Sequence, residues 1–358
     1  MVVKWILRVF AILVILLTLF PYLSFNQWYV RIWDFPHLQI ALLTLFALAF
    51  YFIKFNLKSI SDYAVVLALT GCFLFQSVKI YPYTAFADKE MGNASANVTT
   101  YLSVYAANVL QKNKKVEAVV KDVTKYQSDV VLLTETNERW KNAVVNKLEA
   151  AYKHSFLVPK ENTYGMLLFS KYPLYETKVK YLVEDTIPSI HTKVIIDTKD
   201  TIQLFAIHPA PPTPQHNPSS VDRDAEMMKI TQLTRETEYP VIVLGDFNDV
   251  AWSETTALFQ RVSGLLDMRK GRGFFNTYNA NSWLMRWPLD HVFASADFRV
   301  MQIGRGADIG SDHYPFYAKL SLEPKLAEEQ KLSPPSKEEV AKAFEQISEK
   351  ETSQTAIH

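Results

Sequence analysis

Long uncharged apolar runs occupy the first quarter of the chain. Residues 9–30, 35–53 and 63–78 contain no Asp, Glu, Lys or Arg. About 20 apolar residues are enough for a helix to cross the hydrocarbon core of a bilayer. The pattern therefore predicts an N-terminal bundle of about three transmembrane helices within residues 1–87. A cleaved signal peptide would explain only the first run, which is longer than a usual signal core and is followed by two more.

Basic residues in the short loops predict the orientation of these helices. Lys4 and Arg8 precede the first run and Lys54 and Lys58 separate the second from the third, whereas the intervening loop has only Arg31. Short loops rich in Lys and Arg stay on the cytoplasmic side. The chain is thus expected to be a multi-pass protein of the cytoplasmic (inner) membrane, with everything after the third helix outside the cytoplasm. If the third run does not span, the rest of the chain faces the cytoplasm instead.

From residue 101 to 322, short β-branched or aromatic runs alternate with helical patterns. This alternation predicts an α/β layered domain. The expected strands are 101–107, 130–134, 165–170, 191–197, 202–207, 241–244, 290–294 and 316–322, and the expected helices are 114–126, 137–151 and 221–236. The polar stretch 88–100 is expected to be a linker. Residues 323–358 hold eight Glu, five Lys and one aromatic residue, which predicts a solvated tail, disordered or helical, that buries little apolar surface.

Charge and cysteine content narrow the function classes. The formal net charge of the 358 residues is +1, made up of +3 in residues 1–90, +1 in residues 91–322 and −3 in residues 323–358. The middle segment therefore offers no broad cationic surface for tight, sequence-independent binding of duplex nucleic acid. Two local basic clusters could still contact a substrate, although solvated turns explain them equally: Arg269, Lys270 and Arg272, and Lys112, Lys114 and Lys115. The single cysteine excludes an intrachain disulfide framework and a Cys-based zinc cluster.

Carboxylates and an amide follow two of the predicted strands. Glu135 comes directly after the apolar run 130–134, where a carboxylate is costly unless it is paired or metal-bound; an acid at a helix N-terminus is the structural alternative. Strand 241–244 runs through a glycine into Asp246 and Asn248. These two alternate positions of an extended segment point to the same side and can address one centre, although a lone Gly-Asp-x-Asn is also found in turns.

Histidines and further acids lie at three more strand ends. His208 follows the run 205–207, Asp290 begins the strand 290–294, and Asp312 and His313 precede the strand 316–322. Histidine accepts a proton near neutral pH, a carboxylate can bind a hard cation, and an acid on a strand can orient a histidine from elsewhere. Each histidine alone is more often structural than catalytic. Five strand ends of this kind together predict one catalytic site.

The order of these elements resembles the endonuclease/exonuclease/phosphatase superfamily. The resemblance spans residues 100–322 and rests on Asn108, Leu-Leu-Thr-Glu135, Gly-Met-Leu-Leu-Phe-Ser170-Lys, Ile-His208-Pro, Gly-Asp246-Phe-Asn248, Leu-Asp290-His and Ser-Asp312-His313. It implies a DNase I-like four-layer αββα sandwich with a cleft at one edge. It also implies that Glu135 is the principal ligand of Mg²⁺ or Mn²⁺, with Asn108 beside it and Asp312 close to the metal or its waters.

The resemblance further implies roles in catalysis. His313, oriented by Asp290, would be the general base or a phosphate-binding histidine, and Asp246 would align the attacking water. Asn248 and His208 would donate hydrogen bonds to the phosphate oxygens as charge accumulates. The sequence identifies no carboxylate partner for His208. The abasic-site repair branch carries Asn at that strand end, so the histidine weakens a DNA-repair interpretation.

The predicted activity is hydrolysis of phosphodiester bonds by a membrane-anchored, divalent-metal-dependent enzyme, with an endonuclease as one such activity. A phosphatase, or a phospholipase- or sphingomyelinase-like enzyme acting on lipid or small phosphate esters, is the alternative at the same site. A non-catalytic membrane binding module is the alternative of another class. The expected partners are a phosphate-ester substrate, nucleic acid or phospholipid among them, and the lipid bilayer; no protein partner is identifiable. His291 and His216 are assigned no catalytic role, and the Pro-rich loop 209–218 is a candidate lid.

Overall fold

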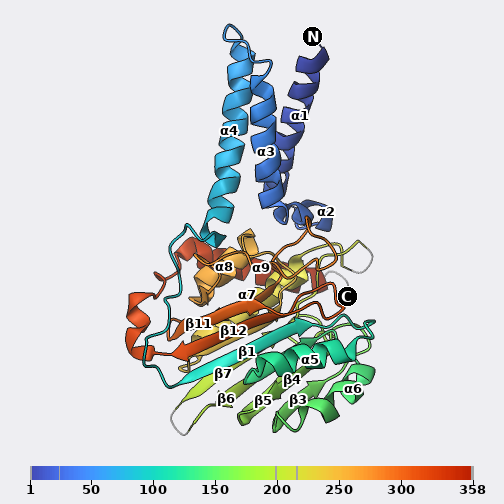
Figure 1. Cartoon of the computed structure of the whole chain (residues 1–358), viewed down its shortest axis with the longest axis vertical. Coiled ribbons are helices and arrows are strands. Elements are labelled where there is room, and N and C mark those ends of the chain that lie inside the picture. Colours follow the sequence, from blue (N-terminus) through green and yellow to red (C-terminus); the bar gives the residue numbers. More distant parts are fainter. Residues whose placement is uncertain (1, 24, 198–199, 215–216, 356–358) are drawn as a thin grey trace.

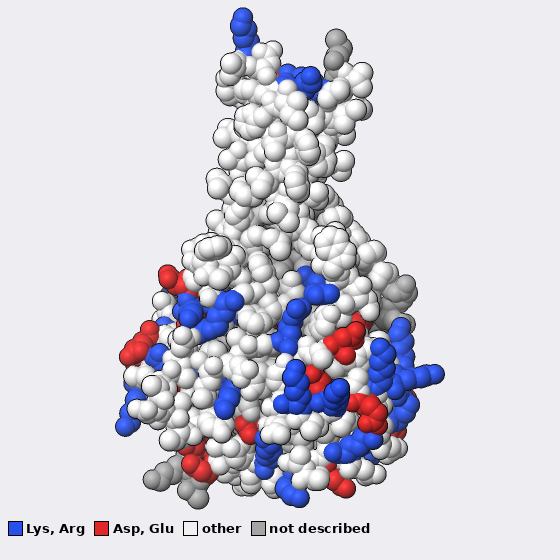
Figure 2. Space-filling view, in the orientation of Figure 1, with Lys and Arg blue, Asp and Glu red and all other residues white. Residues whose placement is uncertain are grey.

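A stalk of helices stands on a globular domain in the computed structural model, which describes residues 2–23, 25–197, 200–214 and 217–355 (Figure 1). Three long helices lie side by side in the stalk, and a short helix lies across its foot: α1 (Val2–Leu19), α3 (His37–Phe52), α4 (Ile60–Ile80) and α2 (Trp28–Arg31). Their outward surface is apolar and exposed. Figure 2 shows this surface as an uncharged neck with Lys and Arg at its far end.

Two stalk helices are long and apolar enough to cross a membrane, Val2–Tyr22 and Ile60–Tyr83. Trp28–Asp34 and His37–Phe52 together would make a third span, bent by 72°. The helix bounds differ from the apolar runs that predicted them. The first helix begins at Val2, and it ends at Leu19 because Pro21 sits in the 3₁₀ turn that follows.

The charged residues at the far end of the stalk are paired. Asp62, fully buried at the start of α4, accepts hydrogen bonds from Lys4 at 2.5 Å and Arg8 at 2.8 Å. The loop that holds Lys54 and Lys58 lies at the same end, since it joins α3 to α4. The basic residues used to predict orientation therefore share one end of the bundle.

The globular domain contains two mixed six-stranded sheets. Their orders are β11-β12-β1-β2-β4-β3 and β5-β6-β7-β8-β10-β9, with β1–β2 and β7–β8 parallel and the remaining neighbours antiparallel. The strands are β1 (Tyr101–Asn108), β2 (Val130–Thr134), β3 (His154–Val158), β4 (Met166–Ser170), β5 (Leu174–Lys180), β6 (Ser189–Ile195), β7 (Thr201–Ile207), β8 (Val241–Asp246), β9 (Leu266–Asp267), β10 (Asp290–Ala294), β11 (Phe298–Arg305) and β12 (Phe316–Leu322).

Helices cover the outer face of each sheet. One sheet is covered by α5 (Val116–Tyr126) and α6 (Glu138–Leu148), and the other by α7 (Val221–Glu236), α8 (Glu254–Ser263) and α9 (Lys337–Thr355). Alternate residues of β1 serve two cores: Leu102 and Val104 face the opposite sheet, whereas Tyr105 faces the helices. The predicted DNase I-like αββα sandwich is confirmed.

The strands that the pattern did not predict are the four edge strands, β3, β5, β9 and β11. Three of them, β3, β5 and β11, are partly exposed and so lack the continuous apolar run of a strand buried on both faces, whereas β9 is buried but only two residues long. Burial along β5 is limited to a few half-buried positions. The helix α8 was also missed, although Ser253 caps its N-terminus by accepting a hydrogen bond from the Thr256 amide and Gly264 ends it.

The expected linker and the expected tail both contribute residues to the core. In the expected linker, Met91 is fully buried between the sheets, and the Ala94 amide donates to the Val300 carbonyl of β11 at 2.9 Å. In the expected tail, α9 packs against α7 and α8 and buries Ala343 and Ile347. The tail is helical, one of the two forms expected for it, and average composition hid the narrow apolar face of this charged helix.

Candidate active site

The candidate site lies where central strands of both sheets end. Asn108 is the last residue of β1, Glu135 follows β2, Asp246 ends β8 and Asp290 begins β10. Antiparallel pairing places Asp290 directly opposite Asp246. Two acids that are 44 positions apart in sequence are thereby neighbours at one edge of the sandwich.

Asn108 connects the two sheets at this edge. Its Nδ2 donates to Glu135 Oε1 at 2.8 Å and to Asp246 Oδ2 at 3.0 Å. The other oxygen of Glu135 accepts a hydrogen bond from the Gln111 amide at 3.2 Å. Glu135 has a left-handed φ of 57°, a conformation that is uncommon outside glycine and is found at functional turns. The Glu135 carboxylate is therefore held in one orientation by an amide from each side.

His313 and Asp290 form a buried pair. His313 Nδ1 donates to Asp290 Oδ2 at 2.7 Å, and its Nε2 lies 3.6 Å from Asp246 Oδ2. Burial alone would lower the pKa of His313, but Asp290 and Asp246 outweigh it and raise that pKa to about 10. Burial raises the pKa of Asp290, which the His313 charge opposes. The histidine is thus held between two carboxylates and favours its charged form.

His208 and Asn248 also lie next to Asp246. His208 Nε2 is 3.7 Å from Asp246 Oδ2, so Asp246 is the carboxylate neighbour that the sequence did not identify. His208 Nδ1 is buried and has no hydrogen-bond partner among the described residues. The Asn248 side chain donates through Nδ2 to the Pro209 carbonyl at 3.0 Å. The backbone N–H of Asn248 donates to Asp246 Oδ1 at 3.0 Å. These bonds fix the Asp246 turn against the loop that follows His208.

A cavity of about 340 Å³ opens onto these groups. Six of the eight residues expected at the site line it: Asn108, Glu135, Asp246, Asn248, Asp312 and His313. The remaining two, Asp290 and His208, are buried and contact the site through His313 and Asp246. All eight expected residues therefore belong to one constellation.

Part of the cavity wall comes from the foot of the stalk, which sequence reasoning missed. Trp28, Arg31, Ile32 and Phe35 line it together with Pro211. No local signal in residues 28–35 points to a site more than 70 residues away. The hydrogen bonds that dock this segment are equally long-range, from the Trp28 amide to the Pro218 carbonyl at 2.7 Å and from Trp252 Nε1 to the Asp34 carbonyl at 2.8 Å.

The acidic groups suit a hard divalent cation. The ligand atoms of Asp246, Asp290 and His313 all lie within 4.8 Å of one another and could hold a metal ion. Glu135 and Asp312 add carboxylates to the same cavity. Carboxylate oxygens are the preferred protein ligands of Mg²⁺ and Mn²⁺, so the donor set fits such an ion.

In the basic cluster of Arg269, Lys270 and Arg272, two side chains are engaged in contacts within the domain. Arg269 is 1% exposed and forms a two-pronged ion pair with Asp267 at 2.9 and 2.8 Å. Arg269 also donates to His291 Nδ1, so His291 Nε2 carries the proton and donates to the Asp249 carbonyl at 2.8 Å. Lys270 pairs with Glu90 at 2.7 Å. His291 is thereby a structural residue, and His216 lies outside the described residues.

The two-sheet sandwich and its acidic, histidine-bearing cleft define a DNase I-like phosphoesterase. The chain belongs to the Endonuclease/Exonuclease/phosphatase family, whose sequence model matches residues 95–313. It is accordingly a hydrolase of phosphate esters in the broad sense. No curated protein matches this sequence.

Solved structures share the fold at low sequence identity. D. rerio TDP2 complexed with a single-strand DNA product is 16% identical with a TM-score of 0.53, covering 62% of this chain and 100% of its own. SmcL is 12% identical with a TM-score of 0.51, covering 62% and 99%. An endonuclease/exonuclease/phosphatase from Beutenbergia cavernae DSM 12333 is 16% identical with a TM-score of 0.51, covering 63% and 72%.

Proposed function

We propose that this chain is a membrane-anchored, divalent-metal-dependent phosphodiesterase. The observation that carries the proposal is the convergence of the His313–Asp290 pair, Asp246 and the Asn108–Glu135 pair on one cavity. The apolar helices of the stalk support the anchoring. The basic residues gathered at the far end of the stalk support a cytoplasmic location for that end and an extracytoplasmic catalytic domain.

We assign the cation, Mg²⁺ or Mn²⁺, to Glu135 and Asp312, with Asn108 beside it. When bound, it would polarise a phosphoryl oxygen and neutralise developing charge. Asn108 presents its nitrogen to Glu135, so in this arrangement it orients the carboxylate. Direct ligation by Asn108 requires its amide to turn over so that the oxygen faces the ion.

The remaining residues act on the phosphate and the attacking water. With its pKa raised to about 10, His313 carries a proton at neutral pH, which favours phosphate binding over the role of general base. Asp246 is the acceptor that can align the water and take its proton. Asn248 and His208 lie next to Asp246, where they can donate to phosphate oxygens as charge accumulates.

A phosphodiester carried by a lipid is the substrate that one further observation favours. Trp28, Ile32 and Phe35 at the foot of the stalk line the catalytic cavity, so the cavity opens beside the expected membrane surface. Nucleic acid is a weaker candidate, because residues 91–322 carry a charge of only +1 and Arg269 is buried. Endonuclease and phosphatase activities are measured in the same experiment.

The test uses the full chain in detergent with Mg²⁺ or Mn²⁺. Phospholipid, single-stranded DNA, bis(p-nitrophenyl) phosphate and a phosphomonoester are assayed in parallel. We expect turnover of a phosphodiester that chelation by EDTA abolishes and added metal restores. Glu135→Ala and His313→Ala should each lower turnover by about 10²–10⁴-fold, whereas His154→Ala on the edge strand β3 should not. Unchanged turnover in both site variants would refute the site, and a wild type inactive on every substrate would favour a non-catalytic binding module.

A further inference from the structure

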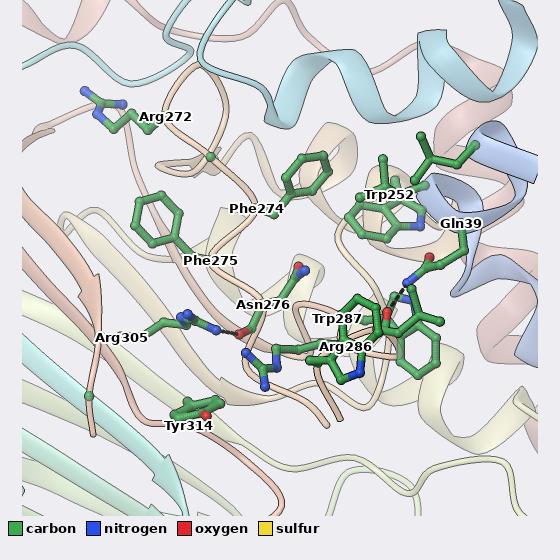
Figure 3. A pocket seen from close by; sticks show the side chains of 16 residues that line it. Gln39, Trp252, Arg272, Phe274, Phe275, Asn276, Arg286, Trp287, Arg305 and Tyr314 are labelled. Carbon is green, nitrogen blue, oxygen red and sulfur yellow. Dashed lines mark hydrogen bonds between the residues drawn. The ribbon is translucent and has the colours of Figure 1, made fainter. Parts of the chain in front are cut away.

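A second, larger cavity lies between the stalk and the globular domain. Its volume is about 830 Å³, and its walls come from the first turns of α3 and from residues 272–287 (Figure 3). Gln39 Nε2 on α3 donates to the Leu284 carbonyl at 2.7 Å, which ties the two walls together. Trp287 lines both this cavity and the catalytic one. The two cavities are therefore neighbours with a shared wall.

Two of the three arginines that line this cavity, Arg286 and Arg305, lie beside one tyrosine and have no counter-charge. The guanidinium carbons of Arg286 and Arg305 each lie 4.9 Å from the centre of the Tyr314 ring, and Figure 3 shows both groups beside that ring. Neither arginine forms an ion pair with any residue in the described part of the chain, and no lining residue is a carboxylate. The cavity is thus a cationic site with no acid to neutralise it.

The hydrogen bonds of these arginines hold the guanidinium groups in place. Arg305 Nη1 donates to the Asn276 carbonyl at 2.6 Å, and Arg286 donates to the Asn279 and Ala280 carbonyls at 3.2 and 3.3 Å. Loss of solvation and the nearby Arg286 charge lower the pKa of Arg305. An anion between the two would relieve this repulsion, and a guanidinium matches the geometry of a phosphate group well.

The other walls are apolar and exposed. Leu42 on α3 is 46% exposed, Trp283 is 88% exposed and Leu284 is 51% exposed. They lie where α3 leaves the globular domain, which is the level at which a stalk in a bilayer would meet the lipid surface. A ligand that fits both surfaces has an anionic head beside Arg286 and Arg305 and an apolar body along α3.

We propose that this cavity binds the phosphate headgroup of an anionic phospholipid, with the acyl chains lying along α3. The inference rests on the proposed membrane anchoring and is independent of hydrolysis, because the cavity contains no carboxylate that could hold a catalytic metal. A lipid held here would fix the globular domain against the membrane next to the catalytic cavity.

Lipid retention by the full chain in detergent tests the proposal. Native mass spectrometry would count phosphatidylglycerol and phosphatidylcholine of identical acyl chains that stay bound. We expect phosphatidylglycerol to bind at least about tenfold more tightly, since hydrogen bonds between charged groups are the strong ones. Arg305→Gln, at an exposed position, should remove most of this preference, and Arg286→Gln with Arg305→Gln should remove all of it. Arg235→Gln, at an exposed position near the end of α7, is the matched control.

Three results would overturn the proposal. Equal retention of the two lipids by the wild type would exclude selection for an anionic head. A preference that persists in both arginine variants would place the lipid elsewhere. If glycerol phosphate displaces bound phosphatidylglycerol as effectively as added phosphatidylglycerol does, the cavity is a site for a free phosphate ester. Flotation of the wild type with phosphatidylcholine vesicles tests the anchor separately, and phosphodiester turnover tests the catalytic proposal separately.

Discussion

Asp290 shows how a single residue can set the chemistry of the site. It is buried, holds His313 Nδ1 at 2.7 Å and faces Asp246 across a strand pair. The pKa of His313 depends on this carboxylate and on Asp246. These interactions involve only Asp290, His313 and Asp246, so a single substitution can remove one of them.

Replacing Asp290 by Asn should therefore change both the rate and its pH dependence. Without the Asp290 charge, the pKa of His313 should fall from about 10 toward its usual value. If the protonated histidine binds phosphate, turnover is lost as pH rises through this pKa, so the alkaline limb should move to lower pH. A pH–rate profile from pH 6 to 10 measures the shift. An alkaline limb that stays in place would show that His313 is not the titrating group.

Arg269 is a residue whose role we expect to be structural. Arg269→Gln would leave Asp267 buried without its partner and remove the donor to His291. Breaking a buried ion pair from one side typically costs about 3–5 kcal/mol. Thermal unfolding of the full chain in detergent should show a clear loss of stability, whereas Arg235→Gln at an exposed position should change stability by less than about 0.5 kcal/mol. Equal midpoints for the two variants would contradict the assignment.

At the scale of elements, prediction from sequence depended on burial. Strands buried on both faces, such as β2 and β8, read as continuous apolar runs and were found with nearly the observed bounds. Of the four edge strands, β3, β5 and β11 were missed because they are partly exposed to solvent, and β9 because it is only two residues long. Polar residues at the ends of the central strands were visible for the same reason, since a polar residue stands out against an apolar run.

The helix α9 is the element whose contribution sequence composition hid. Ile347 is 8% exposed and packs against α7 and α8, whereas Phe344 is 57% exposed. Ile347→Ala should destabilise the domain by about 2 kcal/mol or more, while Phe344→Ala should be close to neutral. Thermal unfolding of the two variants measures the difference. If both variants match the wild type, α9 does not contribute to the stability of the sandwich.

At the scale of the whole molecule, the stalk and the globular domain together form the walls of both cavities. The foot of the stalk lines the catalytic cavity through Trp28 and Phe35, and α3 lines the second cavity through Leu42. Tyr83, in the 3₁₀ turn that follows α4, donates through its hydroxyl to the Ala251 carbonyl at 2.6 Å inside the globular domain. The stalk therefore contributes walls to both cavities as well as connecting to the globular domain.

Accessibility of single cysteines tests the proposed topology. In a Cys72→Ser background, Asn281→Cys on the globular domain and Leu57→Cys in the loop between α3 and α4 form a matched pair of exposed positions. With three spans and a cytoplasmic N-terminus, a membrane-impermeant maleimide should label position 281 in intact cells and position 57 only after permeabilisation. The reverse pattern would place the catalytic domain in the cytoplasm.

The sequence by itself determined the features that are written in local patterns. Apolar runs predicted the stalk helices, alternation predicted an α/β domain, and the order of polar strand ends indicated the family and eight candidate site residues. These signals are local because the backbone period and the burial of each strand constrain neighbouring positions along the chain.

Only the tertiary structure decided which distant residues meet. The bond from Asn108 to Asp246, the packing of α9, the stalk residues that line the catalytic cavity, and Arg286 and Arg305 beside one tyrosine all join parts of the chain that share no local pattern. Such contacts depend on how two sheets and a helical stalk pack in three dimensions. A period read along the chain carries no information about that packing.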